Sequence, residues 1–262
     1  MASVAQYPWQ RSYPEGIPLT VEPSRYPNVV AIIEESFQEH ADKIAYSCMG
    51  RHLTYEELEA RSRDLAAYFQ KVGLSKGDRV AVMLPNILQS PITVMAALRA
   101  GLVVVNVNPL YTPRELKQQL CDSGARAIVL LNTAAGRLQE IVGETDIEHV
   151  LVTELGDMHE NVRGAAINAY MRYIKRMVPH FSLPQAISFK RALKEGEQSS
   201  FKAPPIEAND LAVLQYTGGT TGTPKGAMLL QRNLVAAMPV SYTHLRAHET
   251  ERLIAYAVFC LK

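Results

Sequence analysis

The sequence has few cysteines and no excess of either charge. Its 262 residues include three cysteines, Cys48, Cys121 and Cys260, which are scattered and form no CxxC pair. This pattern argues against a disulfide framework and against a zinc site, and it favours a reducing, cytoplasmic compartment. Lysine and arginine total 27 against 26 acidic residues, which gives a net charge of +1. Because a nucleic-acid-binding surface normally brings a basic excess, we expect no nucleic-acid partner.

Long hydrophobic runs are also scarce. Residues 1–14 lack the apolar core of a signal peptide. The one uncharged stretch of membrane-span length, residues 80–98, is interrupted by Pro85 and Pro91, so it predicts a strand, a turn and a helix rather than a membrane span. Hydrophobic residues make up 47% of the chain and charged residues 20%, which excludes disorder, collagen and coiled coil as descriptions of the whole chain.

What is present is an alternation of short apolar runs with amphipathic segments of helical period. The pairs Thr54/Glu57 and Thr112/Glu115 have the spacing of capping boxes, which start a helix by satisfying free backbone N–H groups. Apolar, β-branched runs are typical of strands buried on both faces of a parallel sheet. We therefore predict an α/β fold with a largely parallel sheet flanked by helices. The expected strands cover residues 80–84, 102–107, 127–131 and 149–153, and the expected helices between them cover residues 90–100, 113–123 and 136–142.

Between residues 156 and 210 the alternation is weaker. Residues 170–180 combine aromatic and aliphatic side chains with Arg172, Lys175 and Arg176. A basic amphipathic segment of this kind is able to rest on a membrane surface. The simpler interpretation is a surface helix whose arginine and lysine stems cover apolar area. Both interpretations stay open, so we expect a cytoplasmic protein, with peripheral contact at the inner face of the membrane as one alternative.

A glycine- and threonine-rich segment directly follows the strand candidate at residues 211–216. Its glycines allow backbone N–H groups to point at an anion without Cβ clashes, its hydroxyls add donors, and its lysine adds a positive charge. This composition predicts a phosphate-binding loop, with a triphosphate as its ligand. The candidate binding residues are Thr217, Gly218, Gly219, Thr220, Thr221, Gly222 and Lys225.

A Walker A loop and a ligand-free hairpin both fit this segment less well. A Walker A loop requires Gly–Lys followed by Ser or Thr, but here Pro224 precedes Lys225 and Gly226 follows it. A ligand-free hairpin connection would leave the concentration of glycine, threonine and lysine after an apolar strand without a reason. The seven histidines are isolated from one another, so we nominate no metal ligand.

The segment YTGGTTGTPKG at residues 216–226 resembles the phosphate-binding signature of the adenylate-forming, or AMP-binding, superfamily. PNILQ at residues 85–89 and NVNPLYTPREL at residues 106–116 are similar to bacterial long-chain fatty acid–CoA ligases. The resemblance covers roughly residues 13–238. It implies the large N-terminal domain of the adenylate-forming fold, in truncated form.

The resemblance also implies a two-step reaction that uses ATP, Mg²⁺ and coenzyme A. A fatty acid carboxylate attacks the α-phosphate of ATP to give an acyl-adenylate and pyrophosphate, and the thiol of coenzyme A then displaces AMP. Residues 217–225 would hold the β- and γ-phosphates, where neutralising charge is the physical requirement. The partners implied are fatty acid, ATP and coenzyme A, and a homodimer of the full-length protein is a further expectation.

Members of the family are considerably longer than this chain. The adenine-contacting strand, the magnesium carboxylate, the ribose-binding aspartate and the catalytic lysine are expected beyond Asn233, so no catalytic residue is assigned here. Leu230 and Gln231 stand where many relatives have a Thr/Ser–His pair, which leaves the role of that histidine without a residue. We therefore expect this chain by itself to be inactive.

Residues 239–262 carry none of this resemblance. The stretches at residues 240–250 and 256–261 back-translate in one frame to sequences that resemble a transposase-type sequencing adapter. We therefore expect residues 1–238 to be a partial N-terminal AMP-binding domain and residues 239–262 to be a translated adapter. The alternative is a native helix that places His244 and His248 one turn apart.

Two functional alternatives also stay open. One is an adenylate-forming ligase for another carboxylate, either medium-chain, aryl or amino acid, since the substrate pocket is expected beyond residue 239. The other is a non-catalytic nucleotide-binding fragment that keeps only the phosphate-binding loop.

Overall fold

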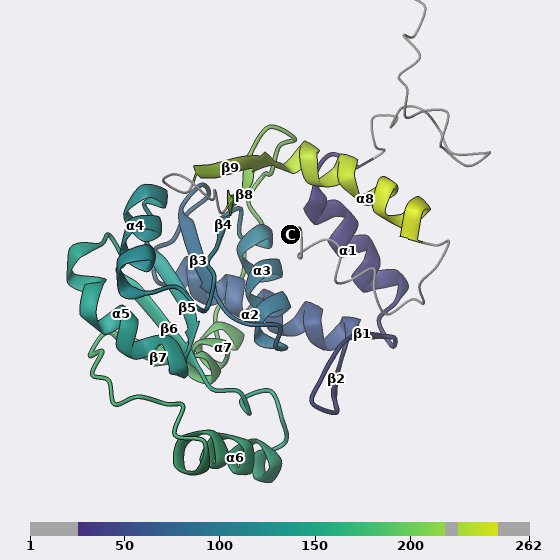
Figure 1. The fold of residues 1–262 in the computed structure, drawn as a ribbon. Coiled ribbons are helices and arrows are strands. Elements are labelled where there is room, and N and C mark those ends of the chain that lie inside the picture. The colour runs from purple at the N-terminus through teal and green to yellow at the C-terminus, as the bar shows by residue number, and fades with distance from the viewer. Residues whose placement is uncertain (1–25, 218–224, 246–262) are drawn as a thin grey trace, which may run out of the picture.

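The core of the fold is a seven-stranded sheet (Figure 1). The structure is a computed structural model that describes residues 26–217 and 225–245. All neighbouring strands are parallel except the last pair, which confirms the predicted α/β fold with a largely parallel sheet. In spatial order the strands are β7 (Ala186–Ser188), β6 (His149–Thr153), β5 (Ala127–Leu131), β3 (Arg79–Met83), β4 (Val103–Asn106), β8 (Leu211–Thr217) and β9 (Lys225–Leu230).

Helices cover both faces of this sheet (Figure 1). The apolar cluster on one face includes residues of α1 (Val29–Glu39), α2 (Tyr55–Lys71), α3 (Gln89–Arg99), α7 (Phe189–Glu197) and α8 (Gln231–Leu245), and the cluster on the other face includes residues of α4 (Pro113–Ser123) and α5 (Ala135–Ile141). A separate hairpin joins β1 (Ile44–Cys48) to β2 (Arg51–Thr54). Outside these layers, α6 (Asn161–Ala169) continues into a π-helical turn over Tyr170–Ile174, and short 3-10 turns flank α5 at Asn132–Ala134 and Val142–Glu144.

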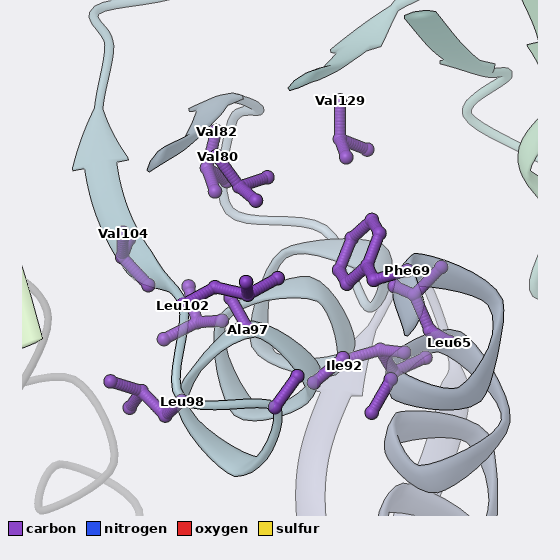
Figure 2. Packing of buried hydrophobic residues seen from close by; sticks show 14 of the residues in the cluster. Leu65, Phe69, Val80, Val82, Ile92, Ala97, Leu98, Leu102, Val104 and Val129 are labelled. Carbon is purple, nitrogen blue, oxygen red and sulfur yellow. The ribbon is translucent and has the colours of Figure 1, made fainter. Parts of the chain in front are cut away.

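The strand side chains divide the core in two because successive residues of a strand point to opposite faces. Val80 and Val82 belong to the apolar cluster that also contains Leu65 and Phe69 of α2, as Figure 2 shows. Their neighbours along β3, including Met83, belong to the second cluster, beneath α4 and α5. The central strands are therefore apolar at almost every position, which is the pattern that the sequence predicted.

Both predicted capping boxes form. The Thr54 side chain accepts from the backbone N–H of Glu57, and the Glu57 carboxylate accepts from the backbone N–H of Thr54. Thr112 and Glu115 make the same reciprocal pair at the start of α4. That helix ends at Gly124, whose φ of 58° lies in the left-handed region that favours glycine.

The region after residue 156 contains more regular structure than the sequence pattern indicated. It holds α6, α7 and the edge strand β7. A strand of three residues is too short to show a period, which is why β7 was not predicted. At the other end of the chain, α8 runs to Leu245 and so passes the domain boundary expected at residue 238.

Candidate functional site

The predicted phosphate-binding segment connects two antiparallel neighbours in the sheet. β8 and β9 pair along their length, and the last pairs are Tyr216 with Gly226 and Thr217 with Lys225. The structure thus brings the two ends of the segment, Thr217 and Lys225, side by side. The other candidate binding residues, Gly218, Gly219, Thr220, Thr221 and Gly222, lie outside the described residues.

This connection supplies an independent argument against a Walker A loop. A Walker A loop leads from a strand into a helix, whose N-terminus then faces the phosphates. Here the chain returns as a strand, β9, so no helix begins at the end of the segment. Without a helix N-terminus, the groups expected to bind an anion are backbone N–H groups, the threonine hydroxyls of the segment and the charge of Lys225, whose side chain is exposed.

Tyr216 lies immediately before the segment and links three elements. Its phenol donates a hydrogen bond of 2.5 Å to Oδ2 of Asp122 in the last turn of α4. Its ring lies against the backbone of Gly226, where an added Cβ would come within 3.1 Å of Cζ of Tyr216. Partial burial, and then the hydrogen bond and charge of Asp122, raise the pKa of the Tyr216 phenol well above its ordinary value. The phenol therefore stays protonated and able to donate at physiological pH.

Side-chain amides join neighbouring elements near the carboxyl ends of β4 and β8. Nδ2 of Asn106, at the end of β4, donates to Oε1 of Gln215 on β8 over 2.8 Å. Nε2 of Gln119 on α4 donates to the backbone oxygen of Asn106 over 2.8 Å. Oε1 of Gln119 is buried and has no hydrogen-bond partner within the part of the chain that the structure describes. These contacts tie α4, β4 and β8 together beside the predicted segment.

Asp122, Gln119 and Gln215 were not nominated from the sequence. Tyr216 and Asp122 are separated by 94 positions, and no short motif contains both. The only local signal was the polar residue near the end of each apolar strand, Asn106 as the last residue of β4 and Gln215 near the end of β8.

Acidic side chains lie near the carboxyl end of β8. Glu115 and Asp122 line a small pocket together with Tyr111, Gln118, Gln119 and Tyr216. Two carboxylates repel an anion, so this pocket does not suit a phosphate group. Among residues 26–217 and 225–245, no group of three or more His, Cys, Asp or Glu side chains is placed to hold a metal ion, so no Mg²⁺ ligand is assigned. The native-helix alternative for the C-terminal residues pairs His244 with His248, and His248 lies outside the described residues.

Comparison with known proteins places the chain in context. The profile of the family described as AMP-binding enzyme matches residues 33–260. The chain is 48% identical over 229 residues to a long-chain-fatty-acid–CoA ligase of Salmonella typhimurium, and 49% identical over 229 residues to one of Escherichia coli O6:H1. Each alignment covers 87% of this chain and 41% of the relative, so the chain spans well under half the length of these proteins.

A solved structure agrees on the fold. The crystal structure of a long-chain-fatty-acid–CoA ligase from Archaeoglobus fulgidus superposes with a TM-score of 0.65 at 22% sequence identity, over 90% of this chain and 46% of that chain. At this identity the likeness concerns the fold: the described sheet and its helices are part of the architecture of that ligase.

Proposed function

This chain belongs to the AMP-binding enzyme family, and we propose that the full-length protein is an ATP-dependent ligase that joins a long-chain fatty acid to coenzyme A. The observation that carries the proposal is the signature at residues 216–226, whose two ends are held together by the β8–β9 pairing. The names of the relatives that are 48–49% identical support a long-chain fatty acid as the substrate.

In this proposal the chain's own residues bind and orient the triphosphate. The fatty acid carboxylate oxygen forms a bond to the α-phosphorus, and the bond from that phosphorus to the pyrophosphate oxygen breaks. The thiol of coenzyme A then loses its proton to solvent, its sulfur forms a bond to the acyl carbon, and the bond from that carbon to the phosphate oxygen breaks, so that AMP leaves with the oxygen. Lys225 and the backbone N–H groups of residues 217–225 would stabilise charge on the β- and γ-phosphates. Mg²⁺, when bound, would neutralise part of the same charge.

The experiment is fatty-acid-dependent exchange of labelled pyrophosphate into ATP, measured with the full-length protein. Palmitate should support exchange, and octanoate, benzoate and amino acids should support it less. Lys225→Ala should lower the exchange rate by roughly 10- to 100-fold, since it removes a charge that the phosphates face. Lys194→Ala, at an exposed lysine of α7, is the matched control and should leave the rate unchanged.

The outcomes separate the alternatives. Exchange that is strongest with benzoate or an amino acid would show that the protein activates that carboxylate rather than a long-chain fatty acid. No exchange with any carboxylate, in a protein that still binds ATP, would favour a non-catalytic nucleotide-binding protein and refute the ligase proposal.

A second observation supports a peripheral contact with an anionic membrane surface. Large apolar side chains on α6 and the turn after it are unusually exposed, with Tyr173 at 70% and Ile174 at 69%. Exposed basic side chains accompany them, at Arg172, Lys175 and Arg176. Such a combination suits a surface of anionic lipid headgroups. Between residues 162 and 177 the other large apolar side chains that are exposed are those of Val162, Tyr170 and Met177.

We propose that this face touches the inner membrane surface, where a long-chain substrate would be concentrated. Arg172 pairs with Glu154, and Nζ of Lys175 lies 5.8 Å from the ring centre of Tyr170, so one basic side chain lies over an apolar ring as the simpler interpretation expects. Tyr173 and Ile174 nevertheless stay exposed to solvent. No helix among the described residues is long and apolar enough to cross a bilayer.

Vesicle co-sedimentation of the full-length protein tests this contact. Vesicles containing phosphatidylglycerol should retain the protein, and pure phosphatidylcholine vesicles should not. The double variant Tyr173→Ser, Ile174→Ser should lower retention about tenfold, because two apolar anchors are lost. Leu110→Ser is the matched control, since Leu110 is 84% exposed but lies before α4. Equal loss in both variants would contradict the proposed surface.

A further inference from the structure

Asp122 occupies a position that the stability of its own helix does not explain. It lies in the last turn of α4, where the helix dipole presents its negative end. A carboxylate is unfavourable there, and no basic residue in that turn compensates for it. Among the described residues, the one hydrogen bond that we find for its carboxylate is the one donated by Tyr216. The contact with Tyr216 of β8, rather than the stability of α4, therefore accounts for this residue.

Tyr216 is placed so that holding its ring constrains both ends of the predicted phosphate-binding segment. It directly precedes Thr217 in β8, and its ring lies against Gly226, which directly follows Lys225 in β9. A side chain at position 226 would meet the ring at 3.1 Å, so glycine is the residue that permits this close approach. The ring thus touches the strand that enters the segment and the strand that leaves it.

We propose that Asp122 is a positioning residue for the phosphate-binding segment. Its carboxylate accepts a hydrogen bond from the phenol of Tyr216. This bond fixes the ring over Gly226 and keeps the Thr217–Lys225 pair at a constant separation. Without the carboxylate, the ring can turn to solvent and the two ends of the segment lose a shared support. The inference rests on the proposed function, because it assumes that residues 217–225 bind ATP.

The test is a double-mutant cycle in the full-length protein with pyrophosphate exchange as the assay. Asp122→Ala and Tyr216→Phe should each raise the KM for ATP about tenfold, which is the loss expected for a hydrogen bond to a charged acceptor. The KM for palmitate should not change. The double variant should resemble either single variant, since both remove the same contact. Asp122→Asn, which keeps an acceptor oxygen, should recover most of the wild-type KM.

Controls separate positioning from general stability. Asp146→Ala removes an exposed aspartate from the turn before β6 and should leave both KM values unchanged. Thermal unfolding should give all variants the same midpoint within a few degrees. Additive effects in the double variant, or an unchanged KM for ATP in Asp122→Ala, would overturn the proposal. If the wild-type protein shows no exchange with any carboxylate, the ligase proposal itself fails, whereas normal exchange with unaffected variants removes only the role of Asp122.

Discussion

At the scale of single residues, a buried cation shows how one side chain joins several helices. Arg99 ends α3, and its side chain is 5% exposed. Its guanidinium pairs with Glu34 of α1 at 2.7 Å and with Glu59 of α2 at 2.8 Å, and it also donates to the hydroxyl of Ser62. Phe37 and Phe201 lie within 6 Å of its charge. A buried charge of this kind is tolerated because two carboxylates pair with it and both terminal nitrogens donate hydrogen bonds, while Nε meets Glu34 as an ion pair only.

Removing that charge should therefore destabilise the protein. Arg99→Met keeps the apolar stem but removes the buried cation from Glu34 and leaves Glu59 with only Arg63, at 3.4 Å. We expect the free energy of unfolding to fall by about 2–4 kcal/mol. Urea unfolding of this chain, followed by circular dichroism, measures the change. Arg114→Met, at an exposed arginine of α4, should change it by no more than about 0.5 kcal/mol. Equal effects of the two substitutions would contradict this role of Arg99.

The capping box of α4 predicts a pH dependence. The backbone N–H of Thr112, and then its hydroxyl, hold the pKa of Glu115 below its ordinary value. Because the folded pKa is lowered, the box stabilises α4 above the unfolded pKa, and this contribution is lost as pH falls through the folded value. An NMR titration should show a lowered pKa for Glu115. Thr112→Val should raise that pKa, and Thr112→Ser should not; an unchanged value in Thr112→Val would assign the shift to the backbone alone.

At the scale of elements, α2 and α7 pack closely because of a glycine. An added Cβ at Gly196 of α7 would lie 1.8 Å from the backbone oxygen of Asp64 in α2. Backbone cannot yield as a flexible side chain does, so any larger residue must push the two helices apart. The contact matters for the sheet as well, since Phe189 of α7 is fully buried in the cluster beneath α2.

Gly196→Ala should accordingly lower the free energy of unfolding by about 2–4 kcal/mol, despite the better helix propensity of alanine. Gly143→Ala is the matched control. Among the residues that the structure describes, and apart from the two chain neighbours, no heavy atom lies within 4 Å of an added Cβ there, so we expect a change within about 0.5 kcal/mol. Urea midpoints of this chain compare the two. A loss at Gly143 as large as at Gly196 would show that backbone freedom, rather than the close approach of the helices, is responsible.

At the scale of the whole molecule, the chain corresponds to less than half of the length of its relatives. It spans 41% of the two ligases compared above, and Met228 on the edge strand β9 is 64% exposed. The groups expected to contact adenine, ribose and Mg²⁺ are assigned to no residue here. We therefore expect this chain to bind ATP at least about 100-fold more weakly than the full-length protein, because most of the contacts are lost. Isothermal titration of both proteins with ATP measures the ratio, and equal affinities would refute this expectation.

Whether residues 239–262 are native also concerns the whole molecule. We propose that residues 1–238 are the native partial domain and that the remainder is a translated sequencing adapter. The family profile extends to residue 260, and α8 crosses the boundary, so the choice between an adapter and a native helix needs the genomic sequence. Sequencing the source locus provides it: the native frame should diverge from this chain after codon 238. An uninterrupted genomic frame that encodes residues 239–262 would make the segment native.

Much of this protein is determined by residues close together in sequence. Continuous apolar runs located the strands β3 to β6, the amphipathic segments between them located the helices, and the spacing of Thr112 and Glu115 located the start of α4. The glycine-rich signature at residues 216–226 predicts a phosphate-binding loop by itself, and this stays a prediction. These features are local, because helix periods, caps and anion-binding loops depend on contacts within a few residues.

Only the tertiary structure decided which elements support that signature. Sheet order places β8 beside β4 although more than a hundred residues separate them in the chain, and this brings Asp122 of α4 to Tyr216. Because the chain returns as β9, Gly226 lies against the same ring. A strand at this position also distinguishes the connection from a Walker A loop, which leads into a helix. A hydrogen bond between distant residues depends on how helices and strands pack, and packing is a property of the whole core rather than of any segment within it.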